Sequence, residues 1–585
     1  MAAVARLVAI AGVLVGSGAA SAADMNYSAE SRGVSSDSSQ SWVSVQINNP
    51  TAGSIPSELV FRGYAGDQSG QITVEVPPVP ANSSRTINIP LQPISADTAT
   101  YKEPRSMPGT LAIPSRYSYS GDPTRRAYVL VTPELNQLTN AELDAFSRAY
   151  VPSDTYTAFG MRSGTSGSST TAPLSAQERI ITQMSASELA ENWLCYLPLK
   201  SVFVSETLEK QITPAQKQAL NTWIQLGGNL VYYDATTSEV AQMGRGTIVR
   251  TAKNPVRDLS HPLSDKFGDA MAVVDNWDSH AMPYAVANRQ NRVGLFILIT
   301  LFMALVGPLN YVYCASKGDI RRLLKTVPLV SAGFCGLIGA YFLFTDGFTR
   351  KGGSISITTL DEERDAAMTF ARHSVISGLY PSGGFHFSTE TLFRPSRVAD
   401  SGAELRLDRE LVLVRGLFRP KMPFNYTTVT PRTTRERLIL DDALKSARNG
   451  FELPLARVAV FDGENYYEGG AGAPGAEITL KRLYPEAVQL PKPDTSFDGA
   501  IPRSQEQITA ETLARIIARG RLTDEEAEYI IQQVQTVADG LGFTSGTVYA
   551  VQFDGVPPGV EPGIKITQGK NLHILYGRAA GETAK

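Results

Sequence analysis

Cysteine and histidine are the residue types in this chain that could supply nucleophilic or metal-binding chemistry, and both are scarce. The 585 residues include three cysteines and five histidines. Cys314 and Cys335 lie in apolar runs, so Cys195 is the one cysteine of a polar region. A single thiol of that kind cannot form an internal disulfide, and three cysteines without paired spacing cannot make a zinc site. The sequence therefore predicts neither a disulfide framework nor a zinc centre.

Motifs that carry a known mechanism are also absent. The sequence holds no Gly-x-x-x-x-Gly-Lys-Ser/Thr loop, no Gly-x-Ser-x-Gly elbow, no His-Glu-x-x-His and no Cys-x-x-Cys. The run from Asp462 to Asn465 is too short for a calcium loop, and the acidic run from Asp524 to Glu528 is typical of a helix start. We therefore predict no catalytic, cofactor-binding or metal-binding residue and no cofactor. Paired carboxylates distant in sequence leave no signature, so carboxylate chemistry stays open.

The amino terminus has the pattern of a secretory signal. Arg6 gives a basic start, residues 7–16 are apolar, and Ala20-Ser21-Ala22 is a small-residue cleavage pattern. We expect a signal peptide over 1–22, with an uncleaved anchor as the alternative. The net charge of -3 gives no general attraction to nucleic acid, so we expect no nucleic-acid partner.

Two later segments have the length and composition of membrane spans. No charged residue occurs between Arg292 and Lys317, or between Lys325 and Asp346. Each stretch holds the roughly 20 residues that a helix needs to cross the hydrocarbon core. We predict transmembrane helices over 293–314 and 326–345, joined by a cytoplasmic loop over 315–325, and a kink at Gly307-Pro308. A hairpin buried in a soluble core is the alternative.

The signal peptide decides the predicted orientation. Basic residues occur in equal number in the loop and on the outer flanks, so the positive-inside rule alone gives a tie. An exported amino terminus makes the first span run inward and the second outward. We therefore expect a two-pass protein of the bacterial inner membrane, with both large regions extracytoplasmic and the lipid bilayer as a partner.

The first exported region divides into two predicted domains. Short alternating runs at 42–47, 71–76 and 86–91 indicate strands with one buried face, and predict an immunoglobulin-like β-sandwich over 23–120. Apolar strands at 127–132, 201–205 and 229–234 follow. Thr213, Pro214 and Gln216 form a capping box at the start of a helix that Gly227 ends. Strand, helix and strand with short connections predict a Rossmann-like (flavodoxin-like) α/β domain over 121–285.

The segment Ala219–Val231 resembles the helix-to-strand step of class I glutamine-amidotransferase-like domains, which occur with immunoglobulin-like domains in bacterial membrane proteins of unknown function. A related arrangement occurs in auxiliary subunits of ABC transporters. The resemblance implies a cysteine on a glycine-flanked elbow and a His-x-Glu pair. Cys195 has no neighbouring glycine, and neither His261 nor His280 has a carboxylate two residues on. We therefore expect the fold without its chemistry, and a buried structural role for Cys195.

The second exported region is predicted to be β-rich. Strand patterns at 353–358, 385–388, 410–415, 437–440 and 457–461 predict a β-sandwich over 350–490. A linker is expected at 491–504. A helical pair and closing strands over 505–585 should complete this carboxy-terminal domain and rejoin its sheet. His573 alternates with apolar neighbours, and we expect it on a sheet face.

The fold class is thus a multidomain α/β plus β membrane protein. The favoured function is a non-catalytic membrane-anchored scaffold or accessory protein with envelope protein partners. Two alternatives stay open: an auxiliary subunit of an envelope ABC-type transporter, and an envelope hydrolase that uses carboxylates.

Overall fold

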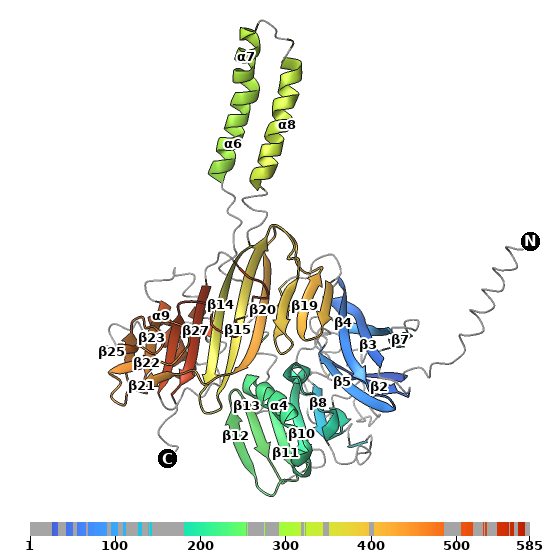
Figure 1. The fold of residues 1–585 in the computed structure, drawn as a ribbon. Helices are drawn as coiled ribbons and strands as arrows, with labels where there is room; N and C mark the ends of the chain where they lie inside the picture. The colour runs from blue at the N-terminus through green and yellow to red at the C-terminus, as the bar shows by residue number, and fades with distance from the viewer. Residues whose placement is uncertain are drawn as a thin grey trace, which may run out of the picture.

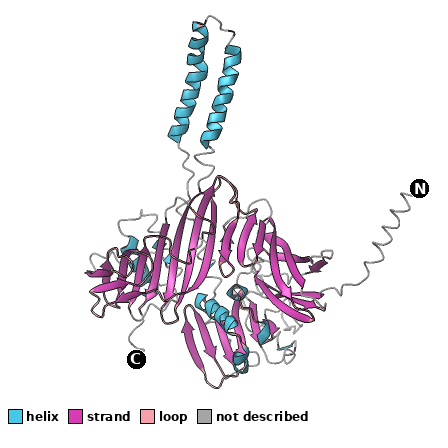
Figure 2. Cartoon of the chain, in the orientation of Figure 1, coloured by secondary structure: helices cyan, strands magenta, loops and turns pink. Residues whose placement is uncertain are grey.

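The chain folds into a mixed α/β structure in which strands far outnumber helices (Figure 2). The predicted signal peptide and the linker at 491–504 lie outside the residues that the structure describes, as do most of the predicted helices at 141–150 and 523–539. The computed structural model describes residues 26–32, 42–50, 55–65, 68–90, 95–102, 109–112, 127–131, 181–252, 292–317, 323–342, 350–396, 403–484, 505–518, 547–560, 562–566 and 571–579, with isolated positions between them.

A 7-stranded sheet combines strands from both ends of the chain, in the order β16-β19-β18-β4-β3-β6-β7. We predicted a sandwich over 23–120 separate from the carboxy-terminal region, and the structure differs. Strand β18 pairs in parallel with β4, with Leu405 opposite Ile72. The strands are β3 (Ile55–Ala65), β4 (Gln68–Val79), β6 (Ser95–Lys102), β7 (Gly109–Ala112), β16 (Phe385–Ser388), β18 (Ala403–Leu407) and β19 (Glu410–Arg415).

A 3-stranded sheet packs against this shared sheet. It consists of β1 (Asn26–Arg32), β2 (Trp42–Asn49) and β5 (Ser83–Pro90), and apolar side chains alternate with polar ones along β2 and β5 as the sequence predicted. Val45 of β2 and Phe61 of β3 share one buried cluster with Phe385 and Leu405, which follow the apolar helices in the chain. The core of the amino-terminal strands is therefore completed by strands more than 300 residues away in sequence.

A 6-stranded sheet forms the α/β part, in the order β12-β13-β11-β10-β8-β9. All its pairings are parallel except that of β12 with β13. Helix α4 (Pro214–Leu226) connects two of the strands, and its predicted capping box between Thr213 and Gln216 is confirmed, as is its end at Gly227. The strands are β8 (Ala127–Val131), β9 (Ile181–Met184), β10 (Leu199–Ser205), β11 (Asn229–Tyr233), β12 (Glu239–Met243) and β13 (Gly246–Arg250).

The largest sheet has 11 strands, in the order β17-β20-β15-β14-β27-β26-β23-β24-β25-β22-β21. The prediction that the last strands rejoin this sheet is confirmed, because β26 and β27 lie at its centre between β14 and β23. Helix α9 (Gln505–Ala518) packs on β23 and β26. The strands are β14 (Arg350–Asp361), β15 (Ala366–Ser377), β17 (Leu392–Pro395), β20 (Phe424–Thr433), β21 (Leu438–Leu440), β22 (Ser446–Asn449), β23 (Leu455–Phe461), β24 (Tyr466–Gly469), β25 (Glu477–Leu483), β26 (Val548–Phe553) and β27 (Asn571–Arg578).

Two apolar helical segments project from this body (Figure 1). The first is made of α6 (Arg292–Ala304), a π-helical turn (Leu305–Leu309) and α7 (Asn310–Ser316), and the second is α8 (Leu323–Phe342). Both are long and apolar enough to cross a membrane, and only 6% of each tested stretch is buried. The wide turn coincides with Pro308, which cannot donate the usual backbone hydrogen bond.

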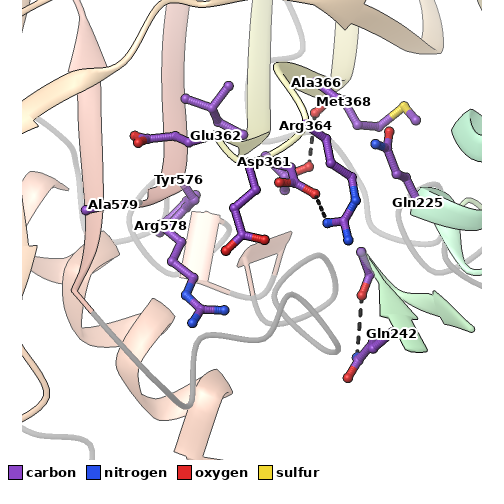
Figure 3. Close-up of a pocket in the computed structure, with 14 residues that line it drawn as sticks. Gln225, Gln242, Asp361, Glu362, Arg364, Ala366, Met368, Tyr576, Arg578 and Ala579 are labelled. Carbon is purple, nitrogen blue, oxygen red and sulfur yellow. Dashed lines mark hydrogen bonds and ion pairs between the residues drawn. The ribbon is translucent and has the colours of Figure 1, made fainter. Parts of the chain in front are cut away.

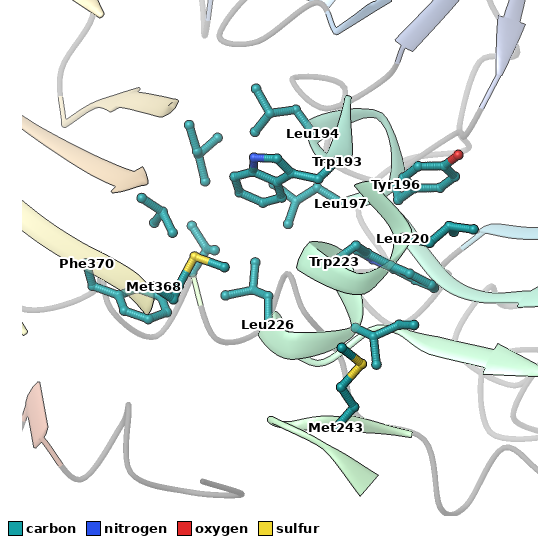
Figure 4. Packing of buried hydrophobic residues seen from close by; sticks show 14 of the residues in the cluster. Trp193, Leu194, Tyr196, Leu197, Leu220, Trp223, Leu226, Met243, Met368 and Phe370 are labelled. Atoms are coloured by element: carbon teal, nitrogen blue, oxygen red, sulfur yellow. The ribbon is translucent and has the colours of Figure 1, made fainter. Parts of the chain in front are cut away.

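The α/β part packs on the 11-stranded sheet through a 3-10 turn at Trp193–Tyr196 and through α4 (Figure 4). Met368 and Phe370 of β15 belong to the same buried cluster as Trp193 and Leu226. The Trp193 indole donates a hydrogen bond to the carbonyl of Glu390 at 2.8 Å. Buried apolar contact and a satisfied indole donor together favour a fixed junction. The regions before and after the apolar helices thus form one folded body.

Candidate functional site

Cys195 lies in the apolar core of the α/β part. Its side chain is buried within the 3-10 turn Trp193–Tyr196. Burial raises the pKa of the Cys195 thiol far above its usual value. A nucleophilic cysteine needs the opposite shift, because the thiolate is the reactive form. His261 and His280, the other two residues considered for this chemistry, lie outside the described residues.

His573 and His373 are buried on one face of the 11-stranded sheet, as predicted for His573. The Ser356 hydroxyl lies 2.7 Å from Nδ1 of His573, and the Thr428 hydroxyl lies 3.0 Å from Nε2 of His373. Burial lowers the pKa of each imidazole to about 3, so both are neutral at pH 7. A serine hydrogen-bonded to a neutral histidine has the chemistry of a nucleophile and base. Neither Ser356 nor His573 lines the two large cavities beside the α/β part, and both side chains are buried.

These two adjoining cavities lie between the α/β part and the turn that joins β14 to β15. One has a volume of about 190 Å³ and the other about 780 Å³, and both are lined by Gln225, Arg364 and Ala366. We call the pair the junction groove. One wall is the outer face of α4, which presents polar residues at helical spacing; these are Gln218, Asn221, Thr222 and Gln225.

Three consecutive acidic residues on the β14–β15 turn line the smaller cavity: Asp361, Glu362 and Glu363 (Figure 3). Asp361 is held by Arg364 at 2.7 Å. Glu362 accepts a hydrogen bond from the Tyr549 hydroxyl and points away from Asp361. Hydrolysis by two carboxylates requires them to face each other across the substrate, roughly 5–9.5 Å apart. Adjacent residues of one turn, with two of them hydrogen-bonded to other side chains, do not make that arrangement.

The carboxyl ends of the parallel strands are where open α/β sheets bind ligands. In this chain an internal ion-pair network occupies that edge. Arg250, at the end of β13, contacts Glu206 at 2.9 Å and Glu209 at 3.2 Å, and its guanidinium lies 4.6 Å from the ring centre of Tyr232. The hydrogen bond to Glu209 raises the pKa of Arg250, and burial, with the Glu209 carboxylate nearby, raises the pKa of Tyr232 to about 12. Arg250 therefore interacts with Glu206, Glu209 and Tyr232 within the protein.

Metal binding finds no support in the part of the chain that the structure describes, where no three His, Cys, Asp or Glu side chains are grouped to hold an ion. Sequence reasoning missed the junction groove. The available signal was the polar spacing 218, 221, 222 and 225 on α4, opposite the apolar face that predicted the helix. The acidic turn is visible in the sequence, but its position beside α4 is a property of the tertiary fold.

The junction groove is therefore a polar surface at the joint between two parts of the body. Its lining combines amide side chains of α4 with charged side chains of the β14–β15 turn, and these groups can hydrogen-bond a ligand. Compared with known proteins, the chain matches no family model. No curated protein is similar enough in sequence to count as a relative.

Proposed function

We propose that this chain is a non-catalytic, membrane-anchored scaffold or accessory protein whose folded body lies outside the cytoplasm. The observation that carries the proposal is the pairing of β4, which precedes the apolar helices, with β18, which comes after them. Two hydrogen-bonded strands lie about 4.8 Å apart, so they cannot be on opposite sides of a hydrocarbon core about 30 Å thick. Two spans between such strands must therefore form a hairpin that leaves both regions on one side.

The side is proposed from the sequence. The signal-peptide pattern over 1–22 supports export of the chain beyond it. The short connection between the helices carries Lys317, Arg321, Arg322 and Lys325, which supports a cytoplasmic position for it.

The absence of catalysis is proposed from the α/β part. When its five parallel strands are numbered along the chain, they lie side by side in the order 2-1-3-4-5. This is the strand order of flavodoxin-like domains, and it supports the amidotransferase-like interpretation. Cys195 is buried, and the ligand-binding edge holds the network of Arg250 with Glu206 and Glu209. The two packed sheets of the amino-terminal strands support an immunoglobulin-like sandwich that borrows strands from beyond the hairpin.

The partner is proposed to be an envelope protein that docks at the junction groove. Its walls come from α4 and the β14–β15 turn, so a bound protein would contact both parts of the body at once. An auxiliary transporter subunit would have the same architecture. The acidic turn does not support the carboxylate hydrolase, because Asp361 and Glu362 point apart and are held by other side chains.

Topology is tested by adding protease to intact spheroplasts that contain the full-length protein. We expect digestion of epitopes placed near residues 100 and 485, and protection of an epitope inserted after Lys317. Survival of either large region, while it stays soluble inside the cell, would contradict the proposal.

Partner binding is tested by placing a photoreactive amino acid at Asn221, exposed on α4, in cells. We expect crosslinks to one defined envelope protein, and none from the same probe at Lys481, exposed on β25. Recovery of an ATPase complex would favour the transporter subunit. Equal, non-specific crosslinking from both positions would contradict docking at the groove.

A further inference from the structure

We infer that one end of the folded body is a contact surface for anionic phospholipid headgroups. The inference rests on the proposed membrane anchor and adds a second, peripheral contact to it. The surface is built from two loops at the end of the 11-stranded sheet where β14 begins. They are residues 378–384, after β15, and 416–423, before β20. We call it the basic end.

Strand register places both loops beside the exit of the hairpin. Arg350, the first residue of β14, is opposite Ser377, the last residue of β15. The backbone amide of Lys421 donates to the carbonyl of Ser377 at 2.8 Å, and the Ser377 hydroxyl donates to the carbonyl of Leu379 at 2.6 Å. These bonds fix the two loops to each other and to the start of β14.

Chain length keeps the basic end close to the bilayer. Arg350 is five residues beyond the predicted end of the second span at 345. Fully extended, that connection reaches at most about 17 Å. The headgroup layer itself adds roughly 5–7 Å beyond the hydrocarbon on each side. Figure 1 shows the apolar helices on this side of the body and the parallel sheet on the opposite side.

Charge is distributed to match an anionic surface. The described segments 350–354, 374–384, 416–426 and 562–566 contain no acidic residue. Glu404 lies on β18, which pairs with β19, the strand that leads into the second loop. Its carboxylate is bound by Arg415 at the end of β19. The same segments carry five basic residues: Arg350, Lys351, Arg419, Lys421 and Lys565. The opposite end of β14 carries both signs of charge, because Arg364 pairs with Asp361 and Arg437 pairs with Asp365. Each basic residue near an anionic leaflet favours binding within a Debye length.

Two exposed apolar side chains lie among these charges. Leu379 is 50% exposed and Met422 is 52% exposed. Pro420 and Pro423 flank Lys421 and Met422 in the second loop, and proline restricts the backbone there. An apolar side chain beside a lysine can insert at the headgroup boundary, as the apolar faces of interfacial helices do.

The test places the photoreactive amino acid benzoylphenylalanine at Leu379 or Met422 of the full-length protein in nanodiscs that contain phosphatidylglycerol. Matched probes replace Asp408 and Glu363, which are exposed on turns at the other end of the strands. A further probe at Leu337, exposed on α8, reports whether the helix is in lipid at all. We expect crosslinks to phospholipid from 379, 422 and 337, several-fold above those from 408 and 363.

The outcomes separate this inference from the proposed anchor. Lipid crosslinks from 337 without any from 379 or 422 would overturn the basic end and leave the anchor standing. No lipid crosslink from 337 would overturn the anchor itself. Crosslinks from 422 to a protein would mean that the surface docks a polypeptide instead.

Charge reversal at two lysines tests the role of charge independently. Lys421→Glu with Lys565→Glu should reduce lipid crosslinking from position 422 in phosphatidylglycerol nanodiscs, and leave crosslinking from 337 unchanged. In nanodiscs of phosphatidylcholine alone, the same pair of changes should have little effect. An equal yield in anionic lipid before and after the changes would contradict a role for charge.

Discussion

Cys195 shows how burial decides the chemistry of a single residue. The thiol lies in the core of the α/β part, next to Trp193 and Tyr196 in the same turn. Because burial raises the pKa of this thiol, it should not react with a thiol reagent until the body opens.

We expect Cys195 to be labelled at the rate of unfolding, in a background with Cys314 and Cys335 replaced by alanine. Cys195→Ser should lower the free energy of unfolding by about 1–3 kcal/mol, because the hydroxyl needs a hydrogen-bond partner in an apolar site. The apolar Cys195→Ala is the control for lost volume. Rapid labelling of the native protein would contradict a buried structural role.

His373 and His573 make the stability of the body depend on pH. Both have a folded-state pKa lowered from 6.5 to about 3 by burial. Between these values the unfolded chain binds more protons than the folded one. The free energy of unfolding is therefore highest above pH 6.5 and falls as the pH drops toward 3, by about 1.4 kcal/mol per pH unit for each imidazole at the steepest.

His573→Gln should weaken the pH dependence of the free energy of unfolding. This is measured in detergent at several pH values between 7.5 and 5. His386→Gln is the matched control, because the side chain of His386 is 48% exposed. An unchanged slope in His573→Gln would show that this imidazole is not the group that titrates.

At the scale of elements, β18 is the link between the two halves of the chain. Leu405 is fully buried in the shared core and pairs across from Ile72. Leu405→Ala should destabilise the body by about 2–5 kcal/mol through lost contact and a cavity. Hydrogen exchange should rise in β4 as well as in β18, although the two are distant in sequence. Val414→Ala, on the half-exposed face of β19, is the control. Faster exchange confined to 403–407 would contradict a cooperative shared sheet.

Local signals in the sequence predicted many of the elements and not their assembly. The capping box at Thr213 and Gln216 and the alternation along β2 depend on neighbouring residues, so they are readable in one sequence. Strand β15 was missed because Arg372, His373 and Ser374 make it look polar, although all three are buried. The pairing of β18 with β4 leaves no local trace, and the junction groove exists only after the two parts pack.

The whole molecule is one body whose chain is interrupted by two apolar helical segments. The 7-stranded sheet and the cluster around Trp193 and Met368 both join residues before α6 to residues after α8. The amino-terminal half does not bury its core alone, because Phe61 and Ile72 belong to a cluster completed by side chains from beyond the apolar helices. The fold therefore does not need the two apolar helices to hold its halves together.

The shared sheet and core should hold the two halves together even when the chain is cleaved between the apolar helices. A site for a specific protease, inserted after Lys317, divides the protein between its two apolar helices without touching the described body. After cleavage in detergent, we expect a tag on residue 585 to recover both fragments, which should separate only in denaturant. The amino-terminal fragment made alone should aggregate, since β4 would then expose an unpaired edge.

Repeating the cleavage with Leu405→Asp and Trp193→Ala, which disrupt the two junctions, should release the fragments from each other. Fragments that part on cleavage of the unaltered protein would mean that the helices, and not the shared sheet and core, hold the halves together.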